Sequence, residues 1–386
     1  MPAFSARAIA AIPLSLYLHW PWCVRKCPYC DFNSHAAPPG LDEGGYADAV
    51  LRDMDGWLGR TQGRPLASIF IGGGTPSLMS GRTVARLIEG ARERFGLAPG
   101  CEITLEANPG TVDEAKFAAF REAGVNRLSI GVQSFSDARL RAIGRIHDAA
   151  QARSAVKSAA RIFDNFNLDL MFALPGETLE GVLADAAEAA ESGATHLSFY
   201  QLTIEPGTVF AKRLPAGLPD ADAAADMSDA VGEALEEAGF EHYEVSGYAK
   251  PGHRCRHNLN YWLFGDYLAA GAGAHGKLTE PPGIVRERRF ASPRLYVPAA
   301  LEGRGAEEVR RVEERDLPFE FMLNALRLRE GVPASLFEER TGMMLSKIDP
   351  ILAGLRAEGL LERDPALLRP TARGRAFLSD VQEAFL

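Results

Sequence analysis

The sequence has little of three features that define other classes of protein. It contains no run of 18 apolar residues, so no segment is predicted to span a membrane. It has no basic excess: the formal net charge of -9 argues against a nucleic-acid groove as the main working surface. Cysteines number only five, and three of them lie close together, which favours metal chemistry over a disulfide framework.

The N-terminal residues only faintly resemble a secretion signal. They include one arginine and several alanines, but their apolar part is short and runs directly into Pro13. We therefore expect no cleaved signal peptide and a loose N-terminus over 1–13. Together with the clustered thiols, this predicts a cytoplasmic location.

Up to about residue 205, apolar strand-like segments alternate with Ala-, Glu- and Arg-rich segments that have helical spacing. The predicted strands are 14–20, 67–71, 102–106, 127–132, 167–172 and 196–203. Helices are predicted between them, for example at 83–95, 113–123 and 179–192. This alternation predicts an α/β fold with a parallel sheet. Six repeats favour an incomplete, TIM-like (β/α)6 barrel, and a doubly wound sheet is the alternative.

The remainder of the chain is less regular and includes a helix at 221–238, a short strand at 243–248 and a glycine-rich stretch at 265–276. We predict a core over 14–300, a linker over 301–316 and a small C-terminal domain over 317–386. Three helices and a hairpin would make that domain either winged-helix-like or a plain helical cap. It has no dense basic recognition helix, so DNA binding is not expected.

Polar or glycine-rich residues follow the carboxyl ends of successive predicted strands. They are Cys23–Cys30, Gly72–Pro76, Glu106, Gln133 and Asp169. Barrels and open parallel sheets both bind ligands at this edge. The sequence therefore predicts one site assembled from five strands.

The loop after the first strand reads Cys23-x-x-x-Cys27-x-x-Cys30. Thiolates are the natural ligands of iron–sulfur clusters, and four normally complete a [4Fe–4S] unit. Three protein ligands leave one iron open, and the amino and carboxylate groups of S-adenosylmethionine (SAM) can fill that position. Two alternatives stay open: a zinc site completed by His19, Asp31 or His35, and a thiol–disulfide pair.

The loop resembles the cluster loop of radical SAM proteins, and other segments extend this resemblance. It implies a barrel of the radical SAM type that contains a [4Fe–4S] cluster and SAM. Such proteins use a low-potential electron to cleave SAM into methionine and a 5′-deoxyadenosyl radical, and the difficult chemistry belongs to the cofactor. The resemblance implies that the cluster ligands are Cys23, Cys27 and Cys30. It implies SAM contacts from Tyr17, Tyr29, Gly73, Gly74, Thr75, Glu106, Gln133, Arg145 and Asp169.

Over nearly the whole chain the sequence resembles the oxygen-independent coproporphyrinogen III oxidase-like family, and within it the HemW-type heme chaperones. Two departures separate it from the true oxidases. Those carry a further cysteine two residues after the third ligand, where this chain has Phe32, and they have a longer N-terminal extension. Both departures speak against porphyrinogen decarboxylation, which is the alternative function in porphyrin biosynthesis.

The segment 257–262, HNLNYW, resembles the heme-binding motif of these chaperones. Histidine is a common axial ligand of heme iron, and Arg254 and Arg256 could pair with propionates. Cys255 is a second possible ligand. The resemblance implies a heme site, within an extension over about 240–280, formed by His257, Asn258, Tyr261 and Trp262. It further implies acceptor hemoproteins as partners and a flavodoxin or ferredoxin as electron donor.

Overall fold

The computed structural model describes residues 4–281 and 283–386. Within them, one curved sheet has twelve strands in the order β14-β13-β12-β11-β1-β4-β5-β6-β7-β8-β10-β9. The six predicted strands are parallel to one another at its centre, and they lie side by side in chain order. Their bounds are β1 Leu14–Trp20, β4 Leu66–Gly73, β5 Leu97–Ala107, β6 Arg127–Gln133, β7 Phe166–Phe172 and β8 His196–Gln201.

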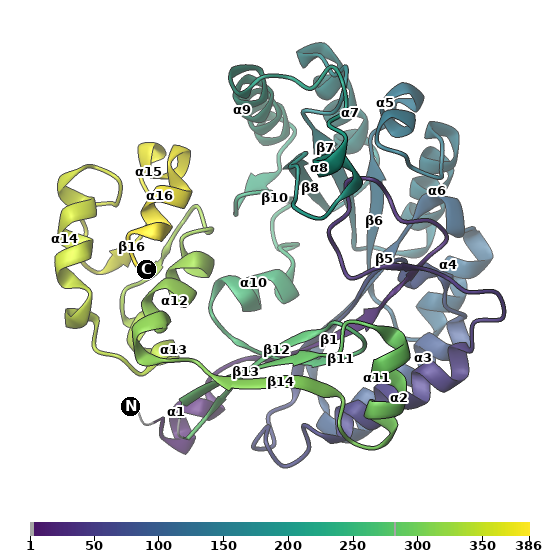
Figure 1. Ribbon diagram of the computed structural model, residues 1–386. Coiled ribbons are helices and arrows are strands. Elements are labelled where there is room, and N and C mark those ends of the chain that lie inside the picture. Colours follow the sequence, from purple (N-terminus) through teal and green to yellow (C-terminus); the bar gives the residue numbers. More distant parts are fainter. Residues whose placement is uncertain (1–3, 282) are drawn as a thin grey trace.

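The sheet bends strongly without closing on itself, so the fold is the expected incomplete barrel (Figure 1). Helices cover its convex outer side, which excludes a doubly wound sheet with helices on both faces. These helices include α2 Glu43–Asp55, α3 Gly81–Phe95, α4 Glu114–Glu122, α5 Asp137–Ala142, α6 Ala149–Ile162, α7 Leu179–Glu191 and α9 Ala221–Glu237. The main hydrophobic core fills the space between these helices and the sheet.

The parallel strands are almost continuously buried, because both faces of the sheet are covered. Alternate residues pack in the main hydrophobic core on one face or lie inside the concave face on the other. On β1, Leu14, Leu16 and Leu18 belong to the main core, whereas Ser15 and His19 are polar and equally buried. Successive side chains of a strand point to opposite faces of the sheet. The concave face is therefore lined by polar and aromatic side chains, as a binding site requires.

The sheet continues beyond β1 through strands that the sequence does not predict. They are β11 Asp266–Ala270, β12 His275–Glu280, β13 Gly283–Arg289 and β14 Ala306–Arg311. At the other edge lie β10 Gly247–Ala249 and β9 Glu241–His242. Helix α10, Arg256–Trp262, packs against β1 and β4 and lies on the concave side (Figure 1). Two further helices are α8 Val209–Lys212, which follows β8 in the chain, and α11 Pro293–Leu301, which packs against α2.

The prediction of a linker over 301–316 is wrong, because this segment contains β14, which pairs antiparallel with β13. Its sequence, AEEVRR, shows no apolar alternation, since both faces of this edge strand are exposed or half-buried. Charged residues on an edge strand prevent pairing with other chains. The expectation of a loose N-terminus is also wrong over the described part: α1, Ala6–Ala10, is capped by Ser5 and buries Ile9.

The C-terminal residues form a helical unit with its own hydrophobic core. Its helices are α12 Leu317–Ala325, α13 Ser335–Thr341, α14 Asp349–Ala357, α15 Ala372–Ala376 and α16 Leu378–Glu383. The predicted hairpin is reduced to a bridge between Leu361 and Pro370, because β16 Leu367–Leu368 pairs with β15 Val332–Pro333 instead. The core of this unit also takes in Ile9 and Phe264. We refer to residues 317–386 as the C-terminal unit.

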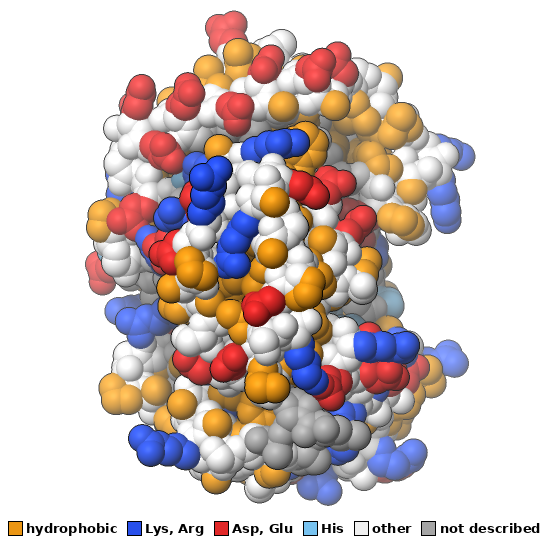
Figure 2. Space-filling model, turned by 90° about the vertical axis from the view of Figure 1, so that its left-hand side faces the viewer, with side chains coloured by type: hydrophobic (Ala, Val, Ile, Leu, Met, Phe, Trp, Pro, Cys, Tyr) orange, Lys and Arg blue, Asp and Glu red, His pale blue; other side chains and the backbone are white. Residues whose placement is uncertain are grey.

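The face that carries the C-terminal unit shows basic, acidic and apolar side chains interspersed, with no continuous basic area (Figure 2). In the described part of the chain, no helix combines the length and apolar character needed to cross a bilayer.

Candidate functional site

The cysteine loop is closed at its base by a small parallel sheet. Its strands are β2, Trp22–Cys23, and β3, His35–Ala36. The amide of His35 donates to the carbonyl of Pro21 at 2.7 Å, and the amide of Ala37 donates to that of Cys23 at 2.8 Å. Within the loop, the Lys26 ammonium donates to the Phe32 carbonyl at 2.8 Å. The loop is therefore a compact structure that presents its three sulfurs from one place.

A cavity of about 430 Å³ opens at the carboxyl edge of the parallel strands, and we call it the cysteine cavity. All three cysteines line it, together with eight of the nine residues predicted to contact SAM. Those eight are Tyr29, Gly73, Gly74, Thr75, Glu106, Gln133, Arg145 and Asp169. Tyr17 does not line it: its hydroxyl hydrogen-bonds to His19 Nδ1 at 2.9 Å and its ring stacks on Phe70. The fold thus gathers residues from five strands into one site.

The glycines at the end of β4 lie where a side chain would not fit. Gly73 has a φ of 117°, which is accessible essentially to glycine alone. A Cβ atom there would lie 2.6 Å from the ring of His19 and 2.7 Å from the Trp20 carbonyl oxygen. The amide of Gly73 donates to Glu106 Oε2 at 2.9 Å. Glycine therefore lets β4 pass close to β1 and brings its backbone to the cavity wall.

Two carboxyl groups, Glu106 and Asp169, share the interior wall of the cavity. Burial, followed by the charge of Asp169, raises the pKa of Glu106 to about 8. Burial also raises the pKa of Asp169. Ser129 and Asn167 each donate a hydrogen bond to this carboxyl group at 2.8 Å, and these bonds lower the pKa by less than burial raises it. Burial disfavours the charged form of a carboxyl group, and at Asp169 it outweighs the opposing charge of Arg127. A cationic ligand group bound here would restore the charge, so this wall suits an ammonium.

Arg145 and Gln133 face the cavity from the end of β6 and the segment after α5. A Cβ at Gly131 would lie 2.9 Å from the Gln133 amide nitrogen and 3.3 Å from Arg145, so both side chains use the space that this glycine leaves. Gln133 has a φ of 67°, a strained conformation of a kind that concentrates at functional sites. Arg145 Nη1 lies 3.7 Å from Cys27 Sγ, while its buried Nε has no hydrogen-bond partner in the described structure.

Sequence reasoning missed cavity residues on the concave faces of strands that it did predict. Tyr200 on β8 donates to Gln133 Oε1 at 2.7 Å, and Ser129 on β6 donates to Asp169. Arg127, two residues before Ser129, is buried outside the cavity lining, and its charge acts to lower the pKa of Asp169. The available signal is alternation: polar side chains at every second position of an otherwise apolar strand indicate a face that lines a site.

The donor set fits a [4Fe–4S] cluster better than a single ion. No group of three or more His, Cys, Asp or Glu side chains converges on a point as one metal ion requires, within residues 4–281 and 283–386. His19, a ligand in the zinc alternative, already uses both ring nitrogens, on Tyr17 and on the Asn33 carbonyl at 2.8 Å. Burial raises the thiol pKa of Cys23 and Cys30, so ligation would displace protons.

The residues predicted to bind heme lie on α10, and none of them lines the cysteine cavity. His257 is buried, and both of its ring nitrogens are engaged, Nδ1 with the Ser68 hydroxyl at 2.9 Å and Nε2 with the Tyr261 hydroxyl at 3.0 Å. Asn258 is half-buried, and the Trp262 ring packs under Arg327. In this conformation His257 offers no free nitrogen to a heme iron.

A parallel incomplete barrel with a three-cysteine loop at its carboxyl edge defines the chain as a radical SAM protein. The model of the Radical SAM superfamily matches residues 17–189, and the HemN C-terminal domain model matches 312–377. The fold is similar to that of coproporphyrinogen III oxidase (HemN) from Escherichia coli, with a TM-score of 0.82 at 22% identity. That likeness covers 98% of this chain and 92% of the enzyme. Membership of this superfamily implies SAM and a [4Fe–4S] cluster.

Curated relatives narrow the identification. Heme chaperone HemW from Escherichia coli K12 is 48% identical over 376 residues, which cover 97% of this chain and 98% of the relative. Heme chaperone HemW from Haemophilus influenzae is 46% identical, with 97% and 98% covered. The mouse mitochondrial radical S-adenosyl methionine domain-containing protein 1 is 36% identical, with 96% and 87% covered. The chain belongs to the HemW family.

Proposed function

We propose that this protein is a heme chaperone, which binds heme and transfers it to acceptor hemoproteins. The observation that carries the proposal is the identity of 48% across the whole chain to a protein named heme chaperone HemW. The likeness to coproporphyrinogen III oxidase, at 22% identity, supports the same fold and no shared reaction. Decarboxylation of coproporphyrinogen III therefore remains the alternative that experiment must exclude.

We assign the cysteine cavity to a [4Fe–4S] cluster and SAM. Cys23, Cys27 and Cys30 would hold three irons and leave the fourth for SAM. When bound, the cluster supplies one electron at low potential. Burial of Glu106 beside Asp169 supports a role for this pair in accepting hydrogen bonds from the SAM ammonium or ribose, because a bound cation lowers a raised carboxyl pKa.

The positive side of the same cavity would face the carboxylate of SAM. Arg145 is buried, and its Nε lacks a partner among the described residues. Burial lowers the pKa of this guanidinium, but Tyr29 and Cys27 outweigh that effect and hold the pKa above its ordinary value. The group therefore stays charged, and charge-assisted hydrogen bonds to a carboxylate are among the stronger ones. Gln133, held by Tyr200, would contact the ribose.

Phe32 supports the chaperone over the decarboxylase. It stands where the true oxidases carry a further cysteine, it lines the mouth of the cysteine cavity, and 57% of it is exposed. An exposed phenylalanine beside a reactive centre contributes an apolar contact and no ligand. We propose that the cluster and SAM have a supporting or regulatory role in heme transfer.

We also propose a reducing, cytoplasmic setting and a flavodoxin or ferredoxin as the electron donor. All five cysteines are free thiols, and Cys27 and Cys30 are only half-buried. Accessible thiols of this kind persist in a reducing compartment. A low-potential cluster needs a donor of similar potential.

The proposal is tested by titrating the purified, anaerobically reconstituted protein with hemin and then adding apomyoglobin. We expect a saturable Soret change on titration and transfer of heme to the acceptor. A parallel assay with coproporphyrinogen III, SAM and dithionite should give no vinyl-bearing product. Failure to bind hemin, or decarboxylation at enzymatic rates, would reject the chaperone assignment.

A further inference from the structure

Three segments of the chain meet around the mouth of the cysteine cavity. The Arg25 guanidinium of the cysteine loop donates to the Gly144 carbonyl, just beyond α5, at 3.0 Å. The same loop contacts α8, where the amide of Phe210 donates to the Pro28 carbonyl at 3.0 Å. Exposed side chains of these segments therefore lie next to one another around the cysteines. We call them the loop face: Val24, Arg25, Lys26, Phe32, Arg141, Val209, Lys212, Arg213 and Leu214.

The loop face carries cations that have no carboxylate partner from this chain. Its five basic side chains are exposed and make no ion pair with any residue that the structure describes: Arg25, Lys26, Arg141, Lys212 and Arg213. The acidic residues of the same segments are fewer. Asp31 and Glu205 line the cavity, and Asp137 accepts a hydrogen bond from the Ala149 amide at 2.8 Å. The surface around the cysteines is thus positive, in a chain whose formal net charge is -9.

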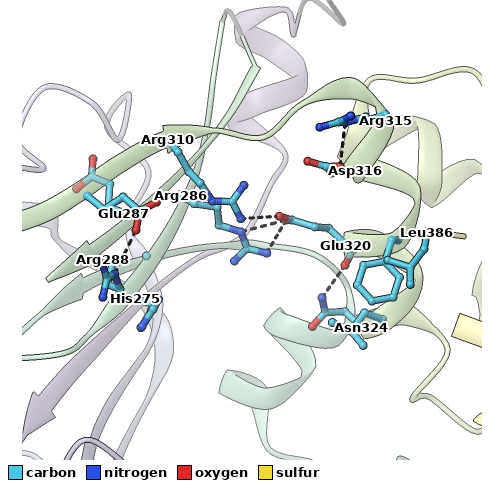
Figure 3. A pocket seen from close by; sticks show the side chains of 14 residues that line it. His275, Arg286, Glu287, Arg288, Arg310, Arg315, Asp316, Glu320, Asn324 and Leu386 are labelled. Atoms are coloured by element: carbon cyan, nitrogen blue, oxygen red, sulfur yellow. Dashed lines mark hydrogen bonds and ion pairs between the residues drawn. The ribbon is translucent and has the colours of Figure 1, made fainter. Parts of the chain in front are cut away.

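The arginines of the other large cavity are in the opposite state. That cavity, of about 510 Å³, is lined by β12–β14 and α12. Each of its arginines lies next to a carboxylate, as do Arg286 and Arg310, which converge on Glu320 at 2.7 Å and 3.4 Å (Figure 3). Charges of opposite sign are therefore balanced within the protein there. At the loop face no acidic side chain of the described chain does the same.

Exposed apolar side chains lie among the cations of the loop face. Val24 and Leu214, which are 55% and 68% exposed, are the chain neighbours of Arg25 and Arg213. Phe32 and Val209 are exposed to a similar degree, at 57% and 56%. Single exposed apolar residues need no explanation, but several that gather on one surface with a charged rim are typical of a protein–protein interface.

We propose that the loop face is the docking surface for a small, acidic one-electron carrier that reduces the cluster. This inference rests on the assignment of a [4Fe–4S] cluster to the cysteine loop, and it deepens that assignment by naming where the reductant binds. Electron transfer slows steeply with distance, so the carrier has to bind beside the loop. One electron passes from the reduced carrier to the cluster, so the carrier is oxidised and the cluster is reduced. Complementary charge speeds the encounter, and the apolar side chains supply the close contact.

The test measures binding of a flavodoxin and of a ferredoxin to the full-length, anaerobically reconstituted protein. Lys212→Glu combined with Arg213→Glu, at the end of α8, should weaken binding about tenfold or more at low salt, and the difference should shrink as added salt screens the charges. The matched control is Arg82→Glu combined with Lys157→Glu. These two cations are also exposed and make no ion pair among the described residues, but they lie on α3 and α6. The control variant should bind the carriers as the wild type does.

A second measurement follows the electron itself. With SAM present, the reduced carrier should reduce the cluster of the α8 double variant about fivefold more slowly than that of the wild type. Dithionite, a small reductant that needs no docking surface, should reduce both clusters to the same extent. Equal iron content and equal SAM affinity of the two proteins would show that the substitutions leave the cysteine cavity intact.

Basic and apolar side chains together also suit an anionic membrane surface, so binding to vesicles of phosphatidylglycerol and phosphatidylcholine is measured alongside. Wild-type affinity of the α8 double variant for both carriers would overturn the proposal, and a loss of vesicle binding in that variant would then assign the loop face to a membrane. Failure of the wild-type protein to bind either carrier would also overturn it. Failure of the wild-type protein to assemble a cluster would instead reject the cluster assignment.

Discussion

The guanidinium of Arg145 lies 3.7 Å from the sulfur of Cys27, although the two residues are 118 positions apart in the chain. The same side chain donates from Nη2 to the Gly131 carbonyl at 2.8 Å. Arg145 therefore joins the cysteine loop to the end of β6, and it carries a buried positive charge to the place proposed for SAM.

Replacing Arg145 with methionine should weaken SAM binding. The variant loses a charge-assisted hydrogen bond worth about 1.5–3 kcal/mol, so the dissociation constant should rise about tenfold or more. Equilibrium binding of SAM to the anaerobic, reconstituted protein measures this. Arg141→Met is the control, because Arg141 is exposed on α5 and should leave binding unchanged. Equal affinities of wild type and Arg145→Met would contradict the role.

Cys27→Ser should prevent assembly of a stable [4Fe–4S] cluster, since serine does not supply a thiolate ligand. Iron and sulfide analysis after anaerobic reconstitution, with the absorbance near 400 nm, should show a loss of most cluster. The control is Cys101→Ser: this thiol is buried on β5, away from the loop, and contacts the Glu102 carbonyl at 3.9 Å. A full cluster in Cys27→Ser, or its loss in Cys101→Ser, would refute the ligand set.

Glu106 should make the SAM-free protein less stable as the pH rises. Its folded-state pKa is about 8, above the ordinary value of 4.5, so between these values the native state holds a proton that the unfolded state releases. The free energy of unfolding then falls as pH rises through this window, by up to about 5 kcal/mol. Melting temperatures of wild type and Glu106→Gln should diverge from pH 5 to pH 8, with the variant the more stable. Parallel pH curves would contradict this ionisation.

His257→Ala should destabilise the protein, because it leaves the hydroxyls of Ser68 and Tyr261 without their partner and removes the ring stacked on Phe70. We expect the free energy of unfolding to fall by roughly 2–4 kcal/mol at pH 7, as measured by urea denaturation. Burial, followed by the charge of Arg127, lowers the His257 pKa to about 3. The wild type should therefore lose this advantage as pH falls from 6.5 toward 3. His253→Ala should change stability by less than about 0.5 kcal/mol.

Lys277→Met should also be strongly destabilising. The Lys277 ammonium lies 3.0 Å from the buried carboxylate of Asp266, which Arg64 also contacts, at 2.8 Å. Burial raises the pKa of Asp266, but Lys277 and Arg64 outweigh that effect and hold it below its usual range. Removing one partner of such a group costs about 3–5 kcal/mol. Thermal melting measures the loss, and the exposed Lys157→Met provides the control. A melting temperature as high as that of the control would argue against the ion pair.

The central strands of the sheet can be predicted from the local sequence pattern. The predicted strand 14–20 coincides with β1, and the other five predicted strands fall on β4–β8 with shifts mainly at their ends. Apolar runs bounded by glycine and polar residues are a property of neighbouring residues, so the sequence displays them directly. The same holds for the cysteine loop, whose three ligands lie within one short segment.

The strands β11–β14, which extend the sheet beyond β1, cannot be predicted from the local sequence pattern. β11 reads DYLAA and packs as an interior strand beside β1, and β14 reads AEEVRR as an edge strand. Whether such segments become strands depends on partners far away in the chain. Asp266, for instance, is stabilised by Arg64, which lies 202 positions away. Pairing of this kind has no signature in either segment alone.

The sequence by itself determined the radical SAM barrel, the cysteine loop and the family to which the chain belongs, because periodicity and motif are local properties. Tertiary structure alone decided the state of each histidine. It buries His257 between Ser68 and Tyr261, and it leaves His275 exposed beside Arg288. The hydrogen bonds and exposure of a side chain are set by residues far away in the sequence, so only the folded chain reveals which histidine is buried with both nitrogens engaged and which is exposed.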